Sequence, residues 1–201
     1  VMDKPGRSYI YRLKKARRRF FEKGSLVSLA DIIQRLETAY SGRDCIVERV
    51  KNKNVVHTAD EFCSDIRALS AYLLKNGLNS NAALVSENSY SWLVSFFAVS
   101  CSGFDCVPLD RELPVAALVS LSKKADCTCF LFSRTYKKAA EAFCAEKNFE
   151  SLCINGECFE NALSEGKQLL KNGFQALQLS KIKGDDPAAI VFTSGTTGAN
   201  K

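Results

Sequence analysis

The residues best suited to chemistry lie together at the C-terminal end of the chain, in the run Thr-Ser-Gly-Thr-Thr-Gly-Ala-Asn-Lys. Glycines let the backbone turn sharply, so that main-chain N–H groups can converge on an anion. Hydroxyl groups and an ammonium group add further hydrogen-bond donors for such an anion. The run therefore predicts a loop that binds the phosphates of a nucleotide. The candidate phosphate-binding residues are Thr193, Ser194, Gly195, Thr196, Thr197, Gly198 and Lys201.

Two better-known phosphate-binding motifs do not fit this chain. A Walker A loop that began at Gly195 would need a second glycine at position 200, which is Asn200. No GxGxxG sequence follows a predicted strand, so the dinucleotide-binding fingerprint is missing as well. The alternative interpretation of the run is a Ser/Thr/Gly-rich surface loop without a ligand.

Alternating apolar strands and helices lead up to this loop. This alternation is typical of a parallel sheet covered by helices on both faces, an α/β fold. In such sheets ligands bind at the carboxyl ends of the strands, which is where the loop would leave the last strand. Strands are predicted at residues 82–85, 105–109, 128–132, 152–154 and 188–193. Helices are predicted at residues 58–74, 89–103, 114–124, 136–147 and 161–171.

The first part of the chain has a different character. A basic helix is predicted at residues 7–24, and a second helix begins after Ser28. Residues 45–50 and 55–57 predict a β-hairpin that turns at residues 51–54. Thr58 and Glu61 then form a Thr-x-x-Glu capping box, which marks the start of the helix after the hairpin.

Charge and composition limit the classes of function. Residues 1–25 hold nine basic and two acidic residues, whereas the remaining 176 hold nineteen basic and twenty acidic residues. The net charge of +6 therefore belongs to the N-terminal segment, and it does not argue for a nucleic-acid-binding protein. No apolar run reaches the ~20 residues that span a bilayer, and no secretory signal is evident. We expect a cytoplasmic protein with a basic segment at 1–25 and one domain at 26–201.

The cysteines and the single histidine do not predict a metal site. The nine cysteines include no CxxC pair, and most lie in apolar runs, which is typical of buried, reduced thiols. Cys127 and Cys129 are two residues apart, a spacing that on a strand would place them on one face. His57 has no nearby nucleophile or carboxylate pattern and is interpreted as a partly exposed strand residue.

The stretch from Ile190 to Lys201 resembles the signature of the adenylate-forming (AMP-binding) superfamily, an apolar run followed by T-S-G-T-T-G-x-P-K. Asn200 stands where the family usually has proline. Residues 86–93 resemble the family's S-E-N-x-x-x-W-L segment, and residues 103–114 resemble its G-x-x-x-V-P-L-D-x-x-L-P segment. The resemblance covers about residues 26–201 and is greatest to long-chain fatty acid–CoA ligases. It implies the N-terminal subdomain of the adenylate-forming fold.

The resemblance also implies a reaction. Members of the family activate a carboxylate with Mg²⁺ and ATP as an acyl-adenylate, and acyl-CoA synthetases then transfer the acyl group to coenzyme A. By position, the six residues 193–198 would contact the β- and γ-phosphates, and Lys201 would neutralise their charge. The family's magnesium, ribose and catalytic residues would follow residue 201. We therefore expect a fragment of an ATP-dependent acid–thiol ligase, inactive alone, with a fatty acid as the carboxylate.

Other interpretations stay open at this stage. The parent protein could adenylate an amino or aryl acid, or the chain could be a non-catalytic module that keeps the fold. The basic stretch Arg12–Arg19, with six positive charges in eight residues, is either attracted to anionic lipid at a membrane surface or docked on an acidic part of the enzyme.

Overall fold

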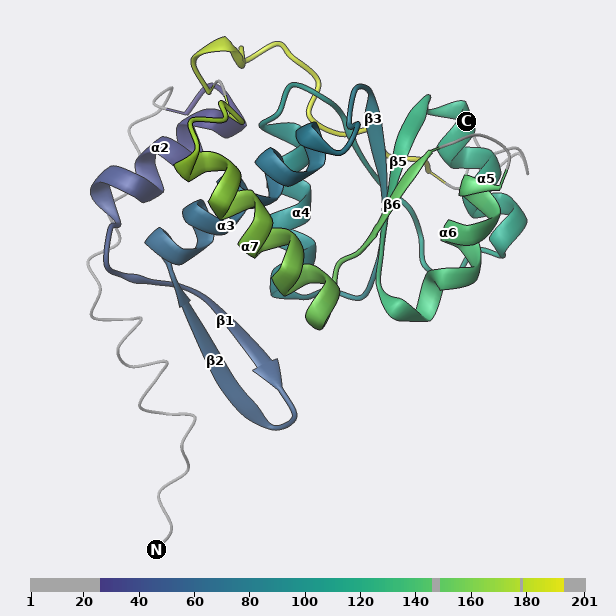
Figure 1. Ribbon diagram of the computed structural model, residues 1–201, viewed down its shortest axis with the longest axis horizontal. Coiled ribbons are helices and arrows are strands. Elements are labelled where there is room, and N and C mark those ends of the chain that lie inside the picture. The colour runs from purple at the N-terminus through teal and green to yellow at the C-terminus, as the bar shows by residue number, and fades with distance from the viewer. Residues whose placement is uncertain (1–25, 146–148, 178, 194–201) are drawn as a thin grey trace, which may run out of the picture.

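The computed structural model describes residues 26–145, 149–177 and 179–193. A parallel sheet of four strands forms the centre of the fold, and a two-stranded hairpin projects from one end of the molecule (Figure 1). The strand order in the sheet is β4-β3-β5-β6. The strands are β3 (Asn81–Val85), β4 (Cys106–Pro108), β5 (Cys127–Phe132) and β6 (Glu150–Cys153).

Helices cover both faces of this sheet, as the alternation of elements predicted. Successive residues of β3 point to opposite faces, so Leu84 joins one buried cluster and Val85 the other. On the side of the first face lie α3 (Ala59–Lys75), α4 (Tyr90–Ser100) and α7 (Glu157–Lys171), and α2 (Leu29–Ala39) packs on α3. The second is covered by α5 (Val115–Lys124) and α6 (Lys137–Cys144). Short 3-10 helices lie at η1 (Arg134–Tyr136) and η2 (Leu179–Lys181).

The capping box predicted at the start of α3 is present. The Glu61 amide donates to Thr58 Oγ1 at 3.2 Å, and the Thr58 amide donates to Glu61 Oε2 at 2.8 Å. These bonds satisfy N–H groups that the first helical turn leaves without partners. Further along, α3 packs closely on α7, where Gly166 lies directly against the Ala68 carbonyl. A local sequence signal therefore begins this helix, and a glycine permits its packing.

The predicted hairpin is confirmed, with a tighter turn than expected. β1 (Asp44–Val50) pairs antiparallel with β2 (Lys53–Thr58). Lys51 and Asn52 both have positive φ, which is typical of the two-residue turns whose twist suits a hairpin. The Tyr90 amide donates to Glu48 Oε1 at 2.9 Å and ties the hairpin to the start of α4.

Two expectations about strands are wrong. Cys127 and Cys129 lie in different buried clusters, because the pairing of β3 with β5 shifts by one residue between them and Thr128 has no partner there. The strand predicted at residues 188–193 is reduced to one parallel bridge between Ala189 and Cys106.

Some boundaries also differ from the prediction. α4 and α6 each end three residues before the predicted end. α7 begins four residues early, after Gly156 with a φ of 64°. The predicted basic helix at 7–24 lies outside the described residues. No described helix is long and apolar enough to cross a membrane.

Candidate functional site

The segment that carries the candidate loop runs alongside β4 at the edge of the sheet. The Cys106 amide donates to the Ala188 carbonyl at 3.2 Å, and the Ile190 amide donates to the Cys106 carbonyl at 3.0 Å. The bridge is parallel, so residues 188–193 run in the same direction as the four strands. Thr193 is therefore delivered toward the carboxyl edge of the sheet, as the sequence predicted.

Pro108 explains why this pairing stops after one bridge. In a parallel ladder the next bond from β4 would come from the amide of residue 108, two residues after Cys106. Proline has no N–H group, so that bond cannot form. A proline is tolerated in β4 because its nitrogen side faces the edge segment, whereas the Leu109 amide donates to the Leu84 carbonyl of β3 at 3.1 Å.

Side chains hold the segment where the ladder does not. Ile190 and Phe192 pack against the buried cluster under α5 and α6. The Lys124 ammonium lies 6.0 Å from the centroid of the Phe192 ring. Val191, between them, is 67% exposed. This alternation fixes the backbone just before the glycine-rich run.

The structure places only the first of the predicted site residues. Thr193 is described and exposed. The other candidates, Ser194, Gly195, Thr196, Thr197, Gly198 and Lys201, lie outside the described residues. The described part of the candidate site therefore consists of the strand ends that surround the start of the loop.

Glu87 is the charged side chain that follows β3 at the carboxyl edge. Its pKa is lowered, first by the hydroxyl of Ser133 and further by the hydroxyl of Thr135 and the guanidinium of Arg111. These neighbours come from the segments after β5 and β4, so three strand ends meet around one carboxylate. Neighbouring strands are about 4.8 Å apart, which puts the end of β3 roughly 10 Å from the edge segment.

Ser133 is fully buried at the end of β5. Its amide donates to the Val85 carbonyl at 3.0 Å, which continues the sheet pairing by one residue. Its hydroxyl makes no hydrogen bond of standard geometry with any described residue, although it lies close enough to Glu87 to lower that pKa. Beside it, the Arg134 amide donates to Asn155 Oδ1, after β6, at 3.1 Å.

Sequence reasoning did not single out this group of polar residues. A signal was available, because Ser-Glu-Asn and Ser-Arg-Thr each follow an apolar strand directly. The carboxyl ends of neighbouring parallel strands meet at one edge of the sheet. The two tripeptides together would have pointed to Glu87, Ser133 and Thr135.

Other candidates for chemistry are accounted for by packing. All nine cysteines are free thiols, and five of them are buried. The His57 ring stacks on Tyr90 with centroids 3.5 Å apart and is half-buried, in agreement with a structural role. Within the described ranges, no group of three His, Cys, Asp or Glu side chains could hold a metal ion.

The protein also has a cavity of about 930 Å³, but it lies elsewhere. Its lining includes Asn81, at the start of β3, and Asp105, just before β4. It therefore opens at the amino edge of the sheet, opposite the carboxyl edge toward which Thr193 is directed.

The comparisons with known proteins agree with this geometry. A family model for the AMP-binding enzymes matches residues 34–201. The chain is 27% identical over 147 residues to a D-alanine–D-alanyl carrier protein ligase of Streptococcus pneumoniae, covering 72% of this chain and 26% of the relative. It is 24% identical over 160 residues to a putative acyl–CoA ligase, YdaB, of Bacillus subtilis, covering 77% of this chain and 31% of the relative.

The fold is also similar to that of a solved enzyme. A long-chain-fatty-acid-CoA ligase (FadD1) from Archaeoglobus fulgidus superimposes with a TM-score of 0.66 at 17% identity, covering 85% of this chain and 35% of that one. At this identity the likeness concerns the fold alone. The chain spans about a quarter to a third of the length of the two curated relatives. Because the family model matches most of its residues, the chain belongs to the AMP-binding enzyme family.

Proposed function

We propose that this chain supplies the phosphate-binding loop of an ATP-dependent ligase that activates a carboxylate as an acyl-adenylate. The observation that carries the proposal is the parallel bridge between Ala189 and Cys106. That bridge directs Thr193, the first residue of the glycine-rich run, to the carboxyl edge of the sheet. Ligands of parallel sheets bind at this edge.

In the proposed reaction, a carboxylate oxygen attacks the α-phosphorus of ATP, and the bond from that phosphorus to the bridging oxygen breaks. Negative charge then develops on the departing pyrophosphate. Backbone N–H groups near Gly195 and Gly198, and the hydroxyls of the loop, would stabilise this charge. The ammonium of Lys201 would neutralise part of it. The loop therefore acts on the leaving group and does not read the base.

Mg²⁺ accompanies ATP in this family, but the described part of the chain does not offer ligands for it. No three carboxylate, thiol or imidazole groups converge there. Oxygen ligands are the ones that Mg²⁺ prefers. We therefore assign no step of the reaction to a metal held by the described residues.

We propose a fatty acid as the carboxylate and coenzyme A as the acceptor of the acyl group. The S-E-N and V-P-L-D-x-x-L-P segments and the relative named as a putative acyl–CoA ligase support this choice. A relative named for D-alanine and its carrier protein supports the alternative, an amino acid. The two alternatives differ in the acid that stimulates the release of pyrophosphate.

The proposal treats residues 26–201 as the N-terminal part of the adenylating domain and residues 1–25 as a separate basic segment, in a cytoplasmic enzyme. Contact of Arg12–Arg19 with a membrane surface and docking of this stretch on an acidic part of the enzyme are the two alternatives for that segment. The 201-residue chain alone should form no acyl-adenylate, because the family's other reactive parts are expected beyond Lys201.

The test measures pyrophosphate release with ATP and a panel of fatty, aryl and amino acids. A protein in which this sequence continues through the rest of the family's domain should release pyrophosphate only when its acid is present. Lys201→Ala should lower that rate at least tenfold, about 1.4 kcal/mol. Lys183→Ala is the matched control, since it removes an exposed lysine at the opposite edge of the sheet.

Two results would contradict the proposal. One is an acid-dependent rate that Lys201→Ala and Lys183→Ala change equally, because the loop would then have no special part in the reaction. The other is steady, acid-dependent pyrophosphate release by the 201-residue chain itself, which would mean that the reactive groups lie within it.

A further inference from the structure

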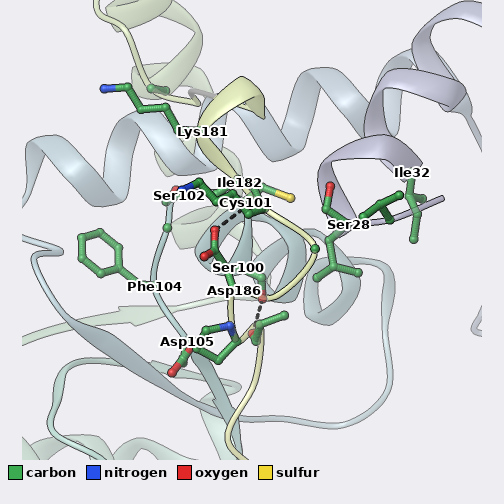
Figure 2. Close-up of a pocket in the computed structure, with 18 of the residues that line it drawn as sticks. Ser28, Ile32, Ser100, Cys101, Ser102, Phe104, Asp105, Lys181, Ile182 and Asp186 are labelled. Atoms are coloured by element: carbon green, nitrogen blue, oxygen red, sulfur yellow. Dashed lines mark hydrogen bonds between the residues drawn. The ribbon is translucent and has the colours of Figure 1, made fainter.

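The cavity at the amino edge of the sheet has three walls from distant parts of the chain. Figure 2 shows Ser28 and Ile32 of the α2 region, residues from Ser100 at the end of α4 to Asp105 before β4, and Lys181, Ile182 and Asp186. The Ser100 hydroxyl donates to the Ala188 carbonyl at 2.8 Å and joins two of these walls. The cavity is thus a built feature of the fold, separate from the strand ends at the opposite edge.

The lining combines apolar side chains with two carboxylates. Leu29, Ile32, Leu74, Phe104 and Ile182 supply apolar surface. Asp105 and Asp186 supply negative charge, and both are fixed locally. The Asp105 amide donates to Asn81 Oδ1 at 3.1 Å, and Asp186 Oδ2 accepts a bond from the Lys183 amide at 2.7 Å. Such a lining offers apolar contacts to an aromatic or aliphatic group, and its carboxylates offer hydrogen bonds to a cationic group.

Two lysines also border the cavity, and both are exposed. The Lys181 side chain extends away from the other labelled residues (Figure 2). A cationic occupant can therefore approach Asp105 without being placed against the Lys181 ammonium, while the second lysine, Lys183, donates its backbone amide to Asp186. The apolar rim is also open, since Val27 beside the cavity is 68% exposed.

The chain itself brings a suitable occupant to this place. The described part begins at Leu26, and Leu26 lines the cavity. The Val27 backbone lies so close to Gly184 that a side chain at position 184 would overlap it. The 25 residues that precede Leu26 are therefore tethered at the mouth of the cavity. An extended chain covers about 3.5 Å per residue, so Phe21 can reach up to roughly 18 Å from Leu26.

The tethered segment has the chemistry that the cavity favours. It reads Arg17-Arg18-Arg19-Phe20-Phe21, three guanidinium groups followed by two aromatic rings. We propose that residues 17–21 dock in this cavity, with Phe20 and Phe21 on its apolar wall and the arginines toward Asp105 and Asp186. The basic segment is then an internal strap across the amino edge of the sheet. Docked in this way, it is withheld from other anionic surfaces such as a lipid membrane.

The test places the photoreactive residue p-benzoylphenylalanine at position 20 of the 201-residue chain and maps the cross-links by mass spectrometry. Cross-links should form within one chain to the peptides that contain Phe104 and Ile182, which are distant in sequence from position 20. The same probe at Tyr9 should give at least fivefold fewer of these cross-links. Far-ultraviolet circular dichroism checks that each variant is folded.

Charge variants separate docking from simple proximity. Asp105→Asn together with Asp186→Asn should lower the cross-link yield at least threefold. Asp185→Asn is the matched control, because Asp185 is exposed and adjacent but does not line the cavity. As a second measurement, Phe20→Ala with Phe21→Ala should speed hydrogen exchange in residues 181–188 at least tenfold.

Several outcomes would overturn the proposal. Cross-links only between two copies of the chain would show that a second molecule receives the segment. Cross-links confined to other surfaces of the same chain would also contradict it, as would hydrogen exchange that the Phe→Ala pair leaves unchanged. Vesicles of phosphatidylserine and phosphatidylcholine should not reduce the internal cross-links at physiological ionic strength. A loss of these cross-links on adding vesicles would favour the membrane as the partner.

Discussion

The two edges of the parallel sheet contrast in what they offer a ligand. At the carboxyl edge, the chain delivers Thr193 and the polar group of Glu87, Ser133 and Thr135. At the amino edge, a cavity of about 930 Å³ is walled by apolar side chains and two carboxylates. The two edges therefore present different residue types to a ligand.

This difference between the edges helps to recognise a ligand site in such a fold. The amino edge has the volume of a small-molecule pocket, lined by apolar side chains, two carboxylates and two lysines. The carboxyl edge has the small hydroxyl and glycine residues that approach an anion closely. The residue types at the strand ends, and not the volume of the amino-edge cavity, are therefore the basis for proposing the carboxyl edge as the nucleotide site.

The largest expected effect is a loss of folding stability at high pH, which would affect both edges of the sheet because it acts through buried thiols of the central strand β5. Burial raises the pKa of Cys129 and Cys127 to about 12, from 9.0 in an exposed thiol. Below pH 9 these thiols are protonated in both states and their contribution to stability is fully present. Between pH 9 and about 12 only the unfolded chain releases the protons, so stability falls as pH rises.

The measurement is the free energy of urea unfolding between pH 8 and pH 11 in a reducing buffer. Cys129→Ala should make its slope against pH less negative, by about 1.4 kcal/mol per pH unit. Cys158→Ala, at an exposed thiol, should leave the slope unchanged. Equal slopes in all three proteins would contradict this account of the buried thiols.

The next largest effect is expected from disturbing the packing of α7 on α3, in the helical layer on one face of the sheet. A Cβ atom at Gly166 would overlap the carbonyl of Ala68, so Gly166→Ala must push α7 away from α3. Overpacking of this kind costs about 1–3 kcal/mol and sometimes more. Urea unfolding should show a loss of about 3 kcal/mol. Ser164→Ala, on the exposed side of α7, should cost less than 0.5 kcal/mol by the usual behaviour of surface positions.

A smaller effect is expected from weakening the link between the amino-edge cavity and the segment that leads to the carboxyl edge. Ser100→Ala removes the bond from the Ser100 hydroxyl to the Ala188 carbonyl, which anchors residues 188–193 at their amino end. Such a bond contributes about 1 kcal/mol. Hydrogen exchange at Ile190 should become roughly fivefold faster, the equivalent of that energy. Ser120→Ala, on the exposed side of α5, is the control, and equal exchange rates in the two variants would refute the anchoring role.

Local signals predicted most of the elements. Thr58 and Glu61 start a helix through bonds between neighbours in sequence, so the capping box could be read directly. The course of residues 188–193 was harder to predict, because the pairing depends on which strand lies beside them. Pro108 on that neighbouring strand ends the ladder, and nothing within residues 188–193 signals it.

The candidate sites differ in the same respect, namely whether their residues are neighbours in the sequence or are brought together by the fold. The glycine-rich run is contiguous, so its residue types could be read without the fold. The group around Glu87 joins three strand ends, and the cavity joins residues near 28, 100 and 185. Neither could be assembled before the strand order β4-β3-β5-β6 was known. The bulge at Thr128, which sends Cys127 and Cys129 to opposite faces, likewise depends on the partner strand.

The most direct test of the account asks which part of a nucleotide the loop contacts. Amide chemical shifts of the ¹⁵N-labelled chain would be followed as pyrophosphate, ATP with Mg²⁺, or AMP is added at millimolar concentration. Pyrophosphate and ATP should shift the amides of residues 193–201, and AMP should leave them in place. Lys201→Ala should weaken the response, whereas Lys183→Ala should not. Equal shifts with AMP, or shifts confined to the residues of the amino-edge cavity, would contradict the assignment of the loop to the β- and γ-phosphates.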